Sequence, residues 1–376
     1  MRVKWARKHV CKYVIFASLL LISIELVFGR PKYFFVTDVE LTRIIVDRFS
    51  SHNIENERVG PFLSGDQTDD ISSKPLFLNG TLRCGKNVNL LIAVISNAKE
   101  HQLRSDIRRS WADKSNYNSS ETHVVFIVGT SAEFSTIDEE QEYNDIVKIH
   151  MPEAYYSLSL KTYAIFRYHS EFCSQARCIL KADSDVVVNV AGVEQLCKAQ
   201  NATPHVTGTC HNYRTNVARS SDSKFYLPKF IFAVDKYPAY CWGAAYMYSG
   251  QNISDLILSA TSKSPFLKSE NFRRLPEDVT FTGLVRILAN VSLEFNSGFA
   301  INRGGFHYWC LEKSSPVPLT AHFRIAKNPV KNWDRMKKEL NGSTSFWSYD
   351  RWRKCRFQGT GYFHLAQDEY DMEEKP

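Results

Sequence analysis

Three apolar runs of strand length alternate with helix-like segments after residue 87. The runs are 88–96 (VNLLIAVIS), 122–130 (THVVFIVGT) and 176–185 (ARCILKADSD). The helix-like segments cover roughly 99–112, 131–143 and 157–172. This alternation predicts an α/β fold with a mainly parallel central sheet and helices on both faces. Ligands of such sheets bind beyond the carboxyl ends of the strands, so we expect the acids that end the third run to lie at a functional edge.

The composition permits a large folded core and excludes several classes of protein. Apolar residues make up 44% of the 376 residues and charged residues 23%, which excludes a globally disordered chain. Five basic residues within the first 12 supply most of the formal net charge of +7, which argues against a nucleic-acid-binding domain. The sequence also contains no G-x-G-x-x-G, Walker A, H-E-x-x-H or G-x-S-x-G motif, so dinucleotide, P-loop, zinc-protease and hydrolase chemistry lose support.

The N-terminus predicts a membrane-anchored, lumenal protein. Residues 13–28 (YVIFASLLLISIELVF) follow the basic cluster and are mostly apolar, which favours a signal-anchor transmembrane helix with a cytosolic tail at 1–12. The alternative is a cleaved signal peptide, but the sequence FGRP after this run is a poor cleavage site. We expect a lumenal stem at 29–86, a catalytic or binding domain at 87–340, and a C-terminal extension with an acidic tail at 341–376.

Cysteines and glycosylation sequons agree with a lumenal location. The eight cysteines that follow Cys11 form an even set, which suits disulfides in an oxidising compartment, although the sequence leaves their pairing open. A zinc site has little support because the chain has no C-x-x-C pair. The candidate N-glycosylation sites are Asn79, Asn118, Asn201, Asn252, Asn290 and Asn341.

Two acidic pairs could perform chemistry. Asp183 and Asp185 flank Ser184 at the end of the third apolar run, where a hard divalent cation such as Mg²⁺ or Mn²⁺ would neutralise them. The alternative is a solvated turn. Glu277 and Asp278 open a helix-like segment, and they could either supply a catalytic base or simply cap that helix.

Two other segments could recognise a ligand. Arg104 and Arg108 stand at i, i+4 on one helical face and could grip a diphosphate, although a solvated basic face is the alternative. The aromatic segment 237–248 surrounds Gly243 and could stack on sugar rings, although core packing is equally compatible with it. Its candidate binding residues are Tyr237, Tyr240 and Trp242.

Six motifs, taken in order, resemble the beta-1,3-galactosyltransferase family, the family 31 glycosyltransferases. They are R-x-x-I-R-x-S-W at 104–111, E-x-x-x-Y-x-D-I at 139–146, LSLKT at 158–162, K-x-D-x-D-V-x-V-N at 181–189, Y-P-x-Y-C-x-G-x-x-Y at 237–246 and E-D-V-x-x-x-G at 277–283. The resemblance extends from about residue 88 to about 335, and a short anchor followed by a stem is the usual layout of that family.

The resemblance implies a GT-A type nucleotide-sugar-binding fold for the domain at 87–340. Asp185 would coordinate Mn²⁺, with Mg²⁺ as an alternative, and His322 would complete the metal shell unless His307 does so. Asp183 would neighbour the metal in the donor site together with Ser184, a position at which the family often has Asp. The matching catalytic base is Asp278.

The remaining matched residues would surround the two substrates. Arg104, Arg108 and Lys161 would lie near the nucleotide, and the acceptor or sugar pocket would contain Tyr237, Tyr240, Trp242, Gly243 and Glu277. The expected function is inverting transfer of galactose from UDP-galactose to a glycan acceptor on a glycoprotein or glycolipid in β-1,3 linkage, by a single-pass type II protein of the Golgi membrane. The alternatives are transfer of N-acetylglucosamine or N-acetylgalactosamine, and a catalytically silent secretory chaperone or glycan-binding protein. No nucleic-acid partner is expected.

Overall fold

The computed structural model describes most of the chain between residues 36 and 341. The described ranges are 36–51, 58–59, 62–63, 70–78, 82–153, 158–211, 213–301, 317–322 and 328–341. The predicted cytosolic tail, the anchor at 13–28, His307 and nearly all of the C-terminal extension lie outside these ranges. Among the helices of the described part, none combines the length and the apolar character needed to cross a membrane.

Strands and helices alternate along the domain, as the apolar pattern predicts. The strands are β1 (Arg58–Val59), β2 (Phe62–Leu63), β3 (Leu90–Ile95), β4 (Thr122–Thr130), β5 (Ile146–Pro152), β6 (Cys178–Asp183), β7 (Val186–Val188), β8 (His205–Cys210), β9 (Cys241–Ser249), β10 (Ser292–Phe295), β11 (Phe299–Ile301) and β12 (Thr320–His322). The α-helices are α2 (Asp38–Ser51), α3 (His101–Arg108), α4 (Ile137–Tyr143), α5 (Leu158–Phe172), α6 (Val190–Ala199), α7 (Ile253–Ser262), α8 (Glu270–Arg273), α9 (Arg286–Leu288) and α10 (Pro329–Leu340). Short 3₁₀ turns occur at η1 (Lys114–Asn116) and η3 (Pro265–Leu267), and η4 (Val279–Val285) is a π-helix.

The central sheet is mainly parallel, which confirms that part of the expected fold. Its strand order is β10-β8-β9-β6-β3-β4-β5. The pairs β6–β3, β3–β4, β4–β5 and β10–β8 are parallel, whereas β9 runs antiparallel to both β6 and β8. The carboxyl ends of β3, β4, β5 and β6 therefore meet at one edge, because parallel neighbours share their direction.

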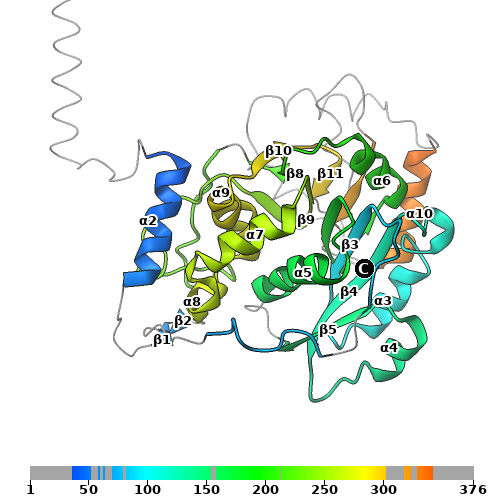
Figure 1. Ribbon diagram of the computed structural model, residues 1–376, viewed down its shortest axis with the longest axis horizontal. Helices are drawn as coiled ribbons and strands as arrows, with labels where there is room; N and C mark the ends of the chain where they lie inside the picture. The colour runs from blue at the N-terminus through cyan, green and yellow to red at the C-terminus, as the bar shows by residue number, and fades with distance from the viewer. Residues whose placement is uncertain are drawn as a thin grey trace, which may run out of the picture.

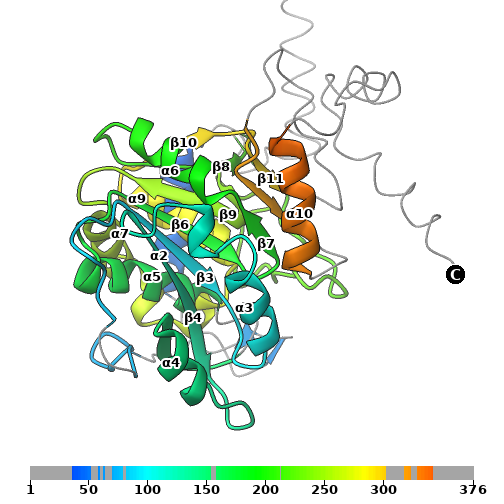
Figure 2. The ribbon, with the colours of Figure 1, turned by 90° about the vertical axis from the view of Figure 1, so that its right-hand side faces the viewer.

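Both faces of this sheet are buried under helices. In β3, Leu91, Ala93 and Ile95 belong to one hydrophobic cluster, while the alternate residues belong to the other. This division follows from the two-residue period of a strand. The first cluster includes residues of α2, α5 and α7, and the second includes residues of α3, α6 and α10. Figures 1 and 2 show the sheet between these two groups of helices.

A small second sheet joins the C-terminal part of the domain to the end of β6. Its order is β11-β12-β7, and β12 runs antiparallel to β7 with His322 opposite Val186. Because Val186 directly follows Asp185, this register places His322 close to Asp185.

The segment predicted as a stem is not a free spacer in its described part. Leu41 and Ile45 of α2 are 1% and 4% exposed and belong to the domain core, and the Phe49 ring meets the Phe272 ring edge-on at 5.0 Å. Phe77 forms an antiparallel bridge with Ile149 at the edge of β5. Apolar burial of this kind contributes about 1.5–3 kcal/mol for each large side chain, so these residues belong energetically to the domain.

Three disulfides stabilise the domain, as the cysteine count suggested. They join Cys84 to Cys173, Cys178 to Cys197 and Cys210 to Cys241. Cys310 and Cys355 lie outside the described residues. The described sequon asparagines are all exposed, namely Asn118, Asn201, Asn252, Asn290 and Asn341. Asn79 lies outside the described ranges.

Candidate functional site

The acids singled out in the sequence lie at the carboxyl edge of the parallel strands. Asp183 is the last residue of β6 and pairs in register with Ile95, the last residue of β3. Ser184 and Asp185 form the short connection from β6 to β7. Partial burial raises the pKa of Asp183, and the nearby Asp185 carboxylate adds to this rise, while Lys181 opposes it.

Lys181 connects the two acidic pairs, a role that the sequence analysis did not assign. Its Nζ lies 2.7 Å from Asp183 Oδ1 and 3.4 Å from Glu277 Oε2, and it donates a hydrogen bond to the Gly243 carbonyl oxygen. The sequence did contain a signal, because Lys181 and Asp183 are two residues apart in an apolar strand and so must share one face. A buried lysine in such a strand requires carboxylate partners, and the structure shows which ones they are.

Asp278 lies beside Gly243, at the other end of this network from Asp183. Its Oδ1 accepts the Val279 N–H at 2.9 Å and its Oδ2 accepts the Gly243 N–H at 3.0 Å. Burial and the neighbouring Glu277 raise the pKa of Asp278 to about 7, against the opposing effects of the Val279 and Gly243 N–H groups and of Lys181. Helix capping and base chemistry are therefore compatible here, since Asp278 caps η4 and also has the pKa of a base that works near neutrality.

Glu277 is fully engaged within the protein. Its Oε1 accepts hydrogen bonds from Thr162 Oγ1 at 2.8 Å and from the Tyr246 hydroxyl, and its Oε2 faces Lys181. The residue is 8% exposed. This arrangement assigns Glu277 the structural task of fixing Lys181 and the strand β9, while its predicted contact with sugar stays a prediction.

Gly243 permits the close approach of β9 to both carboxylates. A Cβ atom at this position would lie 3.2 Å from Glu277 Oε2 and 3.3 Å from Asp278 Oδ2. These distances are shorter than ordinary carbon–oxygen contacts, so any larger residue would push the Asp278 carboxylate away from the Gly243 N–H.

The aromatic residues of the motif at 237–246 separate into two environments. Tyr237 is 5% exposed and packs against Phe232 in the core, so core packing describes this residue. Tyr240 and Trp242 are only partly buried, and both rings contact His211, at centroid distances of 5.8 and 5.2 Å.

His211 is an additional candidate that the sequence analysis missed. The disulfide that joins Cys210 and Cys241 holds β8 beside β9, and His211 and Trp242 each directly follow one of its two cysteines. This arrangement places an imidazole and an indole ring side by side near Asp278.

Asp185 and His322 come together as the resemblance implied. His322 Nε2 lies 3.4 Å from Asp185 Oδ1, and His322 Nδ1 is buried with no hydrogen-bond partner. A carboxylate oxygen and an imidazole nitrogen suit Mn²⁺, and this pair leaves most coordination positions for other ligands. Within the described ranges, no group of three or more potential ligand side chains is assembled to hold a metal.

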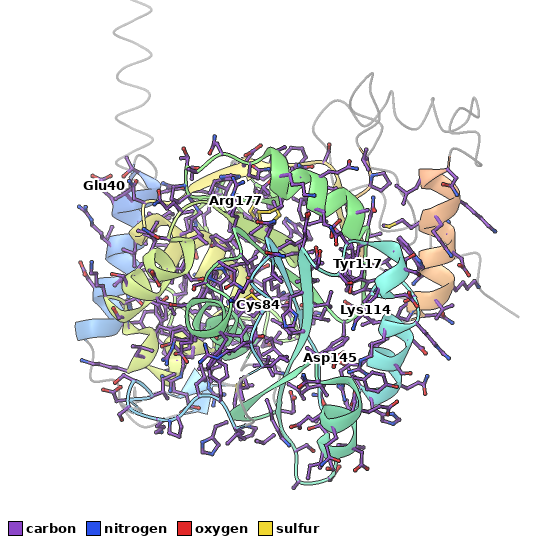
Figure 3. The ribbon with its side chains drawn as sticks, turned by 45° about the vertical axis from the view of Figure 1, so that its right-hand side comes forward. Glu40, Cys84, Lys114, Tyr117, Asp145 and Arg177 are labelled. Carbon is purple, nitrogen blue, oxygen red and sulfur yellow. A yellow bond between two sulfur atoms is a disulfide. The ribbon has the colours of Figure 1, made fainter. Side chains whose placement is uncertain are left out.

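Arg104 and Arg108 are bound to carboxylates of the protein. Arg104 is 0% exposed and its guanidinium lies 2.6 Å from Glu139, while Arg108 contacts Glu139 and Asp145, each at 2.7 Å. Figure 3 labels Asp145, directly before β5. The motifs at 104–111 and 139–146 therefore form one ion-pair cluster, so we assign the two arginines a structural task, and direct contact with a nucleotide stays a prediction.

The same edge contains a loop fixed by buried charges. Arg104 donates to the carbonyl oxygens of Asn97 and Ala98, at 2.5 and 3.2 Å. Lys161 Nζ donates to the Ser96 carbonyl oxygen at 2.7 Å and pairs with Glu153 at 2.6 Å. Burial lowers the pKa of Lys161, although Glu153 opposes this effect.

Ser184 joins this loop to the acidic end of β6. Its hydroxyl donates to Glu100 Oε2 at 3.0 Å, and the same oxygen accepts the Asn97 N–H at 2.9 Å. Three of the predicted donor residues, Arg104, Lys161 and Ser184, thus contact the loop at 96–100.

Comparison with known proteins finds similarity in the segment that carries this site. Residues 102–285 match the family model described as Galactosyltransferase. This segment of the chain is similar to the galactosyltransferase family. The chain is also 28% identical over 200 residues to beta-1,3-galactosyltransferase 1 of Homo sapiens, and the aligned region covers 52% of this chain and 61% of that protein. It is 28% identical over 209 residues to beta-1,3-galactosyltransferase 5 of Pan paniscus, covering 54% of this chain and 66% of that protein.

These matches cover less than two thirds of either relative's length. Among solved structures, a galactosyltransferase LgtC in complex with donor and acceptor sugar analogs aligns with 70% of this chain and 99% of its own, at 11% identity and a TM-score of 0.33. A TM-score of that size does not establish a common fold. The segment matched by the family model contains all the candidate substrate-binding and catalytic residues above except His322.

Proposed function

We propose that the protein is an inverting, UDP-sugar-dependent glycosyltransferase of GT-A type that transfers galactose to a glycan acceptor in β-1,3 linkage. The family domain and the two named relatives support the reaction class. One structural observation supports it most strongly. Lys181 and Gly243 join Asp183 to Asp278, so a donor-side and an acceptor-side carboxylate share one bonded network.

Asp278 acts as the general base in this proposal. The proton of the acceptor hydroxyl passes to an Asp278 oxygen while the hydroxyl oxygen forms its bond to the anomeric carbon. The bond from that carbon to the UDP β-phosphate oxygen breaks, and UDP leaves with the electron pair, so the α-linked donor gives a β-linked product. Each of the two Asp278 oxygens accepts one backbone N–H and keeps a second lone pair, which is available for the proton of the acceptor.

Asp185 and His322 would hold Mn²⁺, or Mg²⁺ in its place, against the donor diphosphate. The unpartnered His322 Nδ1 and the Asp185 carboxylate are consistent with this role. The bound ion would offset the negative charge that develops on the departing diphosphate. Ser184, Arg104 and Lys161 hold the loop at 96–100 next to the end of β6.

A donor screen tests the proposal. The purified protein is incubated with UDP-galactose, UDP-N-acetylglucosamine or UDP-N-acetylgalactosamine, with Mn²⁺ or with EDTA, and released UDP is measured. We expect Mn²⁺-dependent release from UDP-galactose, which is lost in Asp185→Ala. Turnover of an N-acetylated donor alone would reassign the donor, and no binding or turnover of any UDP-sugar would favour a silent, glycan-binding protein.

Residence in the Golgi membrane is part of the same proposal. The three disulfides and the exposed sequon asparagines of the described part suit an oxidising, glycosylating compartment. Microscopy of the full chain against a Golgi marker, with endoglycosidase digestion to reveal attached glycans, tests this assignment.

A further inference from the structure

The helix α2 lies against the segment that carries the acceptor-side residues. We propose that Asp38 is a positioning residue, through which α2 holds the segment 237–243 in place for the acceptor. This inference rests on the proposed function, because it assigns the acceptor to the side of Asp278. Figure 1 shows α2 beside α9, on the opposite side of the molecule from α10.

Local sequence determines where α2 begins and how Asp38 is oriented. Thr37 and Glu40 form a reciprocal capping box, in which the Glu40 N–H bonds to Thr37 Oγ1 at 3.2 Å and the Thr37 N–H bonds to Glu40 Oε2 at 2.8 Å. Glu40 is labelled at this end of α2 in Figure 3. Since Leu41 and Ile45 are buried in the domain, the helix has a fixed rotation, and Asp38 in its first turn faces the protein.

Asp38 makes two bonds to residues far away in the sequence. Its Oδ1 lies 2.7 Å from Arg214 Nε, and its Oδ2 accepts the Ala239 N–H at 3.0 Å. Arg214 also donates to the Val36 carbonyl oxygen. On the other side of Ala239, its carbonyl oxygen accepts a hydrogen bond from Arg286 Nη2 at 3.2 Å. The peptide groups around Ala239 are thus held from both sides.

This attachment is transmitted to Asp278 through a short stretch of chain. The Tyr240 carbonyl oxygen accepts the His211 N–H at 2.8 Å, and the Gly243 N–H binds Asp278 at 3.0 Å. Tyr240 and Trp242, whose rings contact His211, lie between these bonds. A shift of Ala239 would therefore move the half-buried rings of Tyr240 and Trp242 relative to Asp278, while the donor-side loop at 96–100 is held by other residues.

The test compares substitutions on the same helix in the full-length protein. Asp38→Ala removes both bonds, and Asp38→Asn retains an oxygen for the Ala239 N–H but loses the charge that pairs with Arg214. Asp47→Ala is the matched control, because Asp47 is an exposed acid on α2. For each variant, the KM values for acceptor and donor, the rate of UDP-sugar hydrolysis and hydrogen–deuterium exchange in 237–243 are measured.

We expect Asp38→Ala to raise the acceptor KM about tenfold, which corresponds to about 1.4 kcal/mol, and Asp38→Asn to raise it by about threefold. The donor KM and the hydrolysis rate stay at the values of the Asp47→Ala control, and exchange in 237–243 becomes faster. An unchanged acceptor KM, or an equal increase in both KM values, would overturn the inference. If Asp38→Ala does not fold, the same criteria apply to Asp38→Asn.

The two proposals fail in different ways. A wild-type chain that turns over no UDP-sugar contradicts the proposed function. Hydrogen–deuterium exchange then tests the attachment of 237–243 to α2 by itself. Faster exchange in 237–243 of Asp38→Ala supports the role of Asp38, and unchanged exchange refutes it.

Discussion

The substitution Asp278→Asn separates the chemistry of this protein from its binding of the donor. Asparagine has the shape of the carboxylate but cannot take the acceptor proton. General bases contribute about 10²- to 10⁴-fold to rate, so we expect kcat for transfer to fall by about this factor. The dissociation constant for UDP, measured by calorimetry, should change by less than about twofold, because the β6 acids and the loop at 96–100 are untouched.

The same substitution should alter how stability depends on pH. Folding raises the Asp278 pKa from an ordinary 3.8 to about 7. A carboxyl group with a raised pKa stabilises the fold while it is protonated, and this contribution is lost as pH rises from about 4 to about 7. A shift of about 3 units corresponds to at most about 4 kcal/mol, and the partial exposure of Asp278 reduces this to on the order of 2 kcal/mol.

Urea unfolding of both proteins across this range measures the effect. The free energy of unfolding of the variant minus that of the wild type should increase by about 2 kcal/mol from about pH 4 to about pH 7 and then stay constant. The variant also loses some stability at every pH, because the single amide oxygen of asparagine cannot accept both the Val279 and the Gly243 N–H groups. A difference that does not vary with pH, or full transfer activity in Asp278→Asn, would refute the assignment of Asp278 as a base with a raised pKa.

Three other substitutions test neighbouring parts of the site. Gly243→Ala should lower kcat by about tenfold, because the new methyl group displaces the Asp278 carboxylate, whereas in Gly85→Ala the Cβ has only a 3.8 Å contact and activity should be kept. Lys181→Met should lower the free energy of unfolding by about 3–5 kcal/mol in urea titrations, since it leaves the buried Glu277 carboxylate without its cation, and an unchanged unfolding curve would contradict that pairing. Asp185→Ala should weaken Mn²⁺-dependent UDP binding by at least about tenfold in calorimetry, and equal affinities with Mn²⁺ and EDTA in both proteins would argue against a metal ligand at this position.

Part of the site could be predicted from local sequence because strand patterning fixes where residues lie along an edge. An apolar run that ends in Asp183 and Asp185 has to place them at the end of a buried strand, and parallel neighbours bring that end to a shared edge. The segment that begins at Asp278 was expected to be helical, and it is, although as a π-helix that continues into α9.

Other roles depend on partners far away in the sequence, and local patterns do not specify such partners. The local sequence offers Arg104 and Arg108 either as a grip for a diphosphate or as a solvated basic face. In the fold, Glu139 pairs with both arginines and Asp145 pairs with Arg108, across more than 30 residues of chain. The even cysteine set indicated disulfides without giving their pairs, because several pairings satisfy the same count. The segment at 29–86 is polar on average, so its composition does not reveal the apolar face of α2 that packs on the domain.

The sequence by itself determined the alternation of strands and helices, the acidic edge and the family resemblance, because each of these depends on residues that are neighbours in the chain. Only the tertiary structure showed that Lys181 joins the two acidic pairs, that β12 brings His322 to Asp185, and that α2 binds the segment 237–243. These contacts arise from sheet register and side-chain packing between distant segments, and both are fixed only when the whole domain is folded.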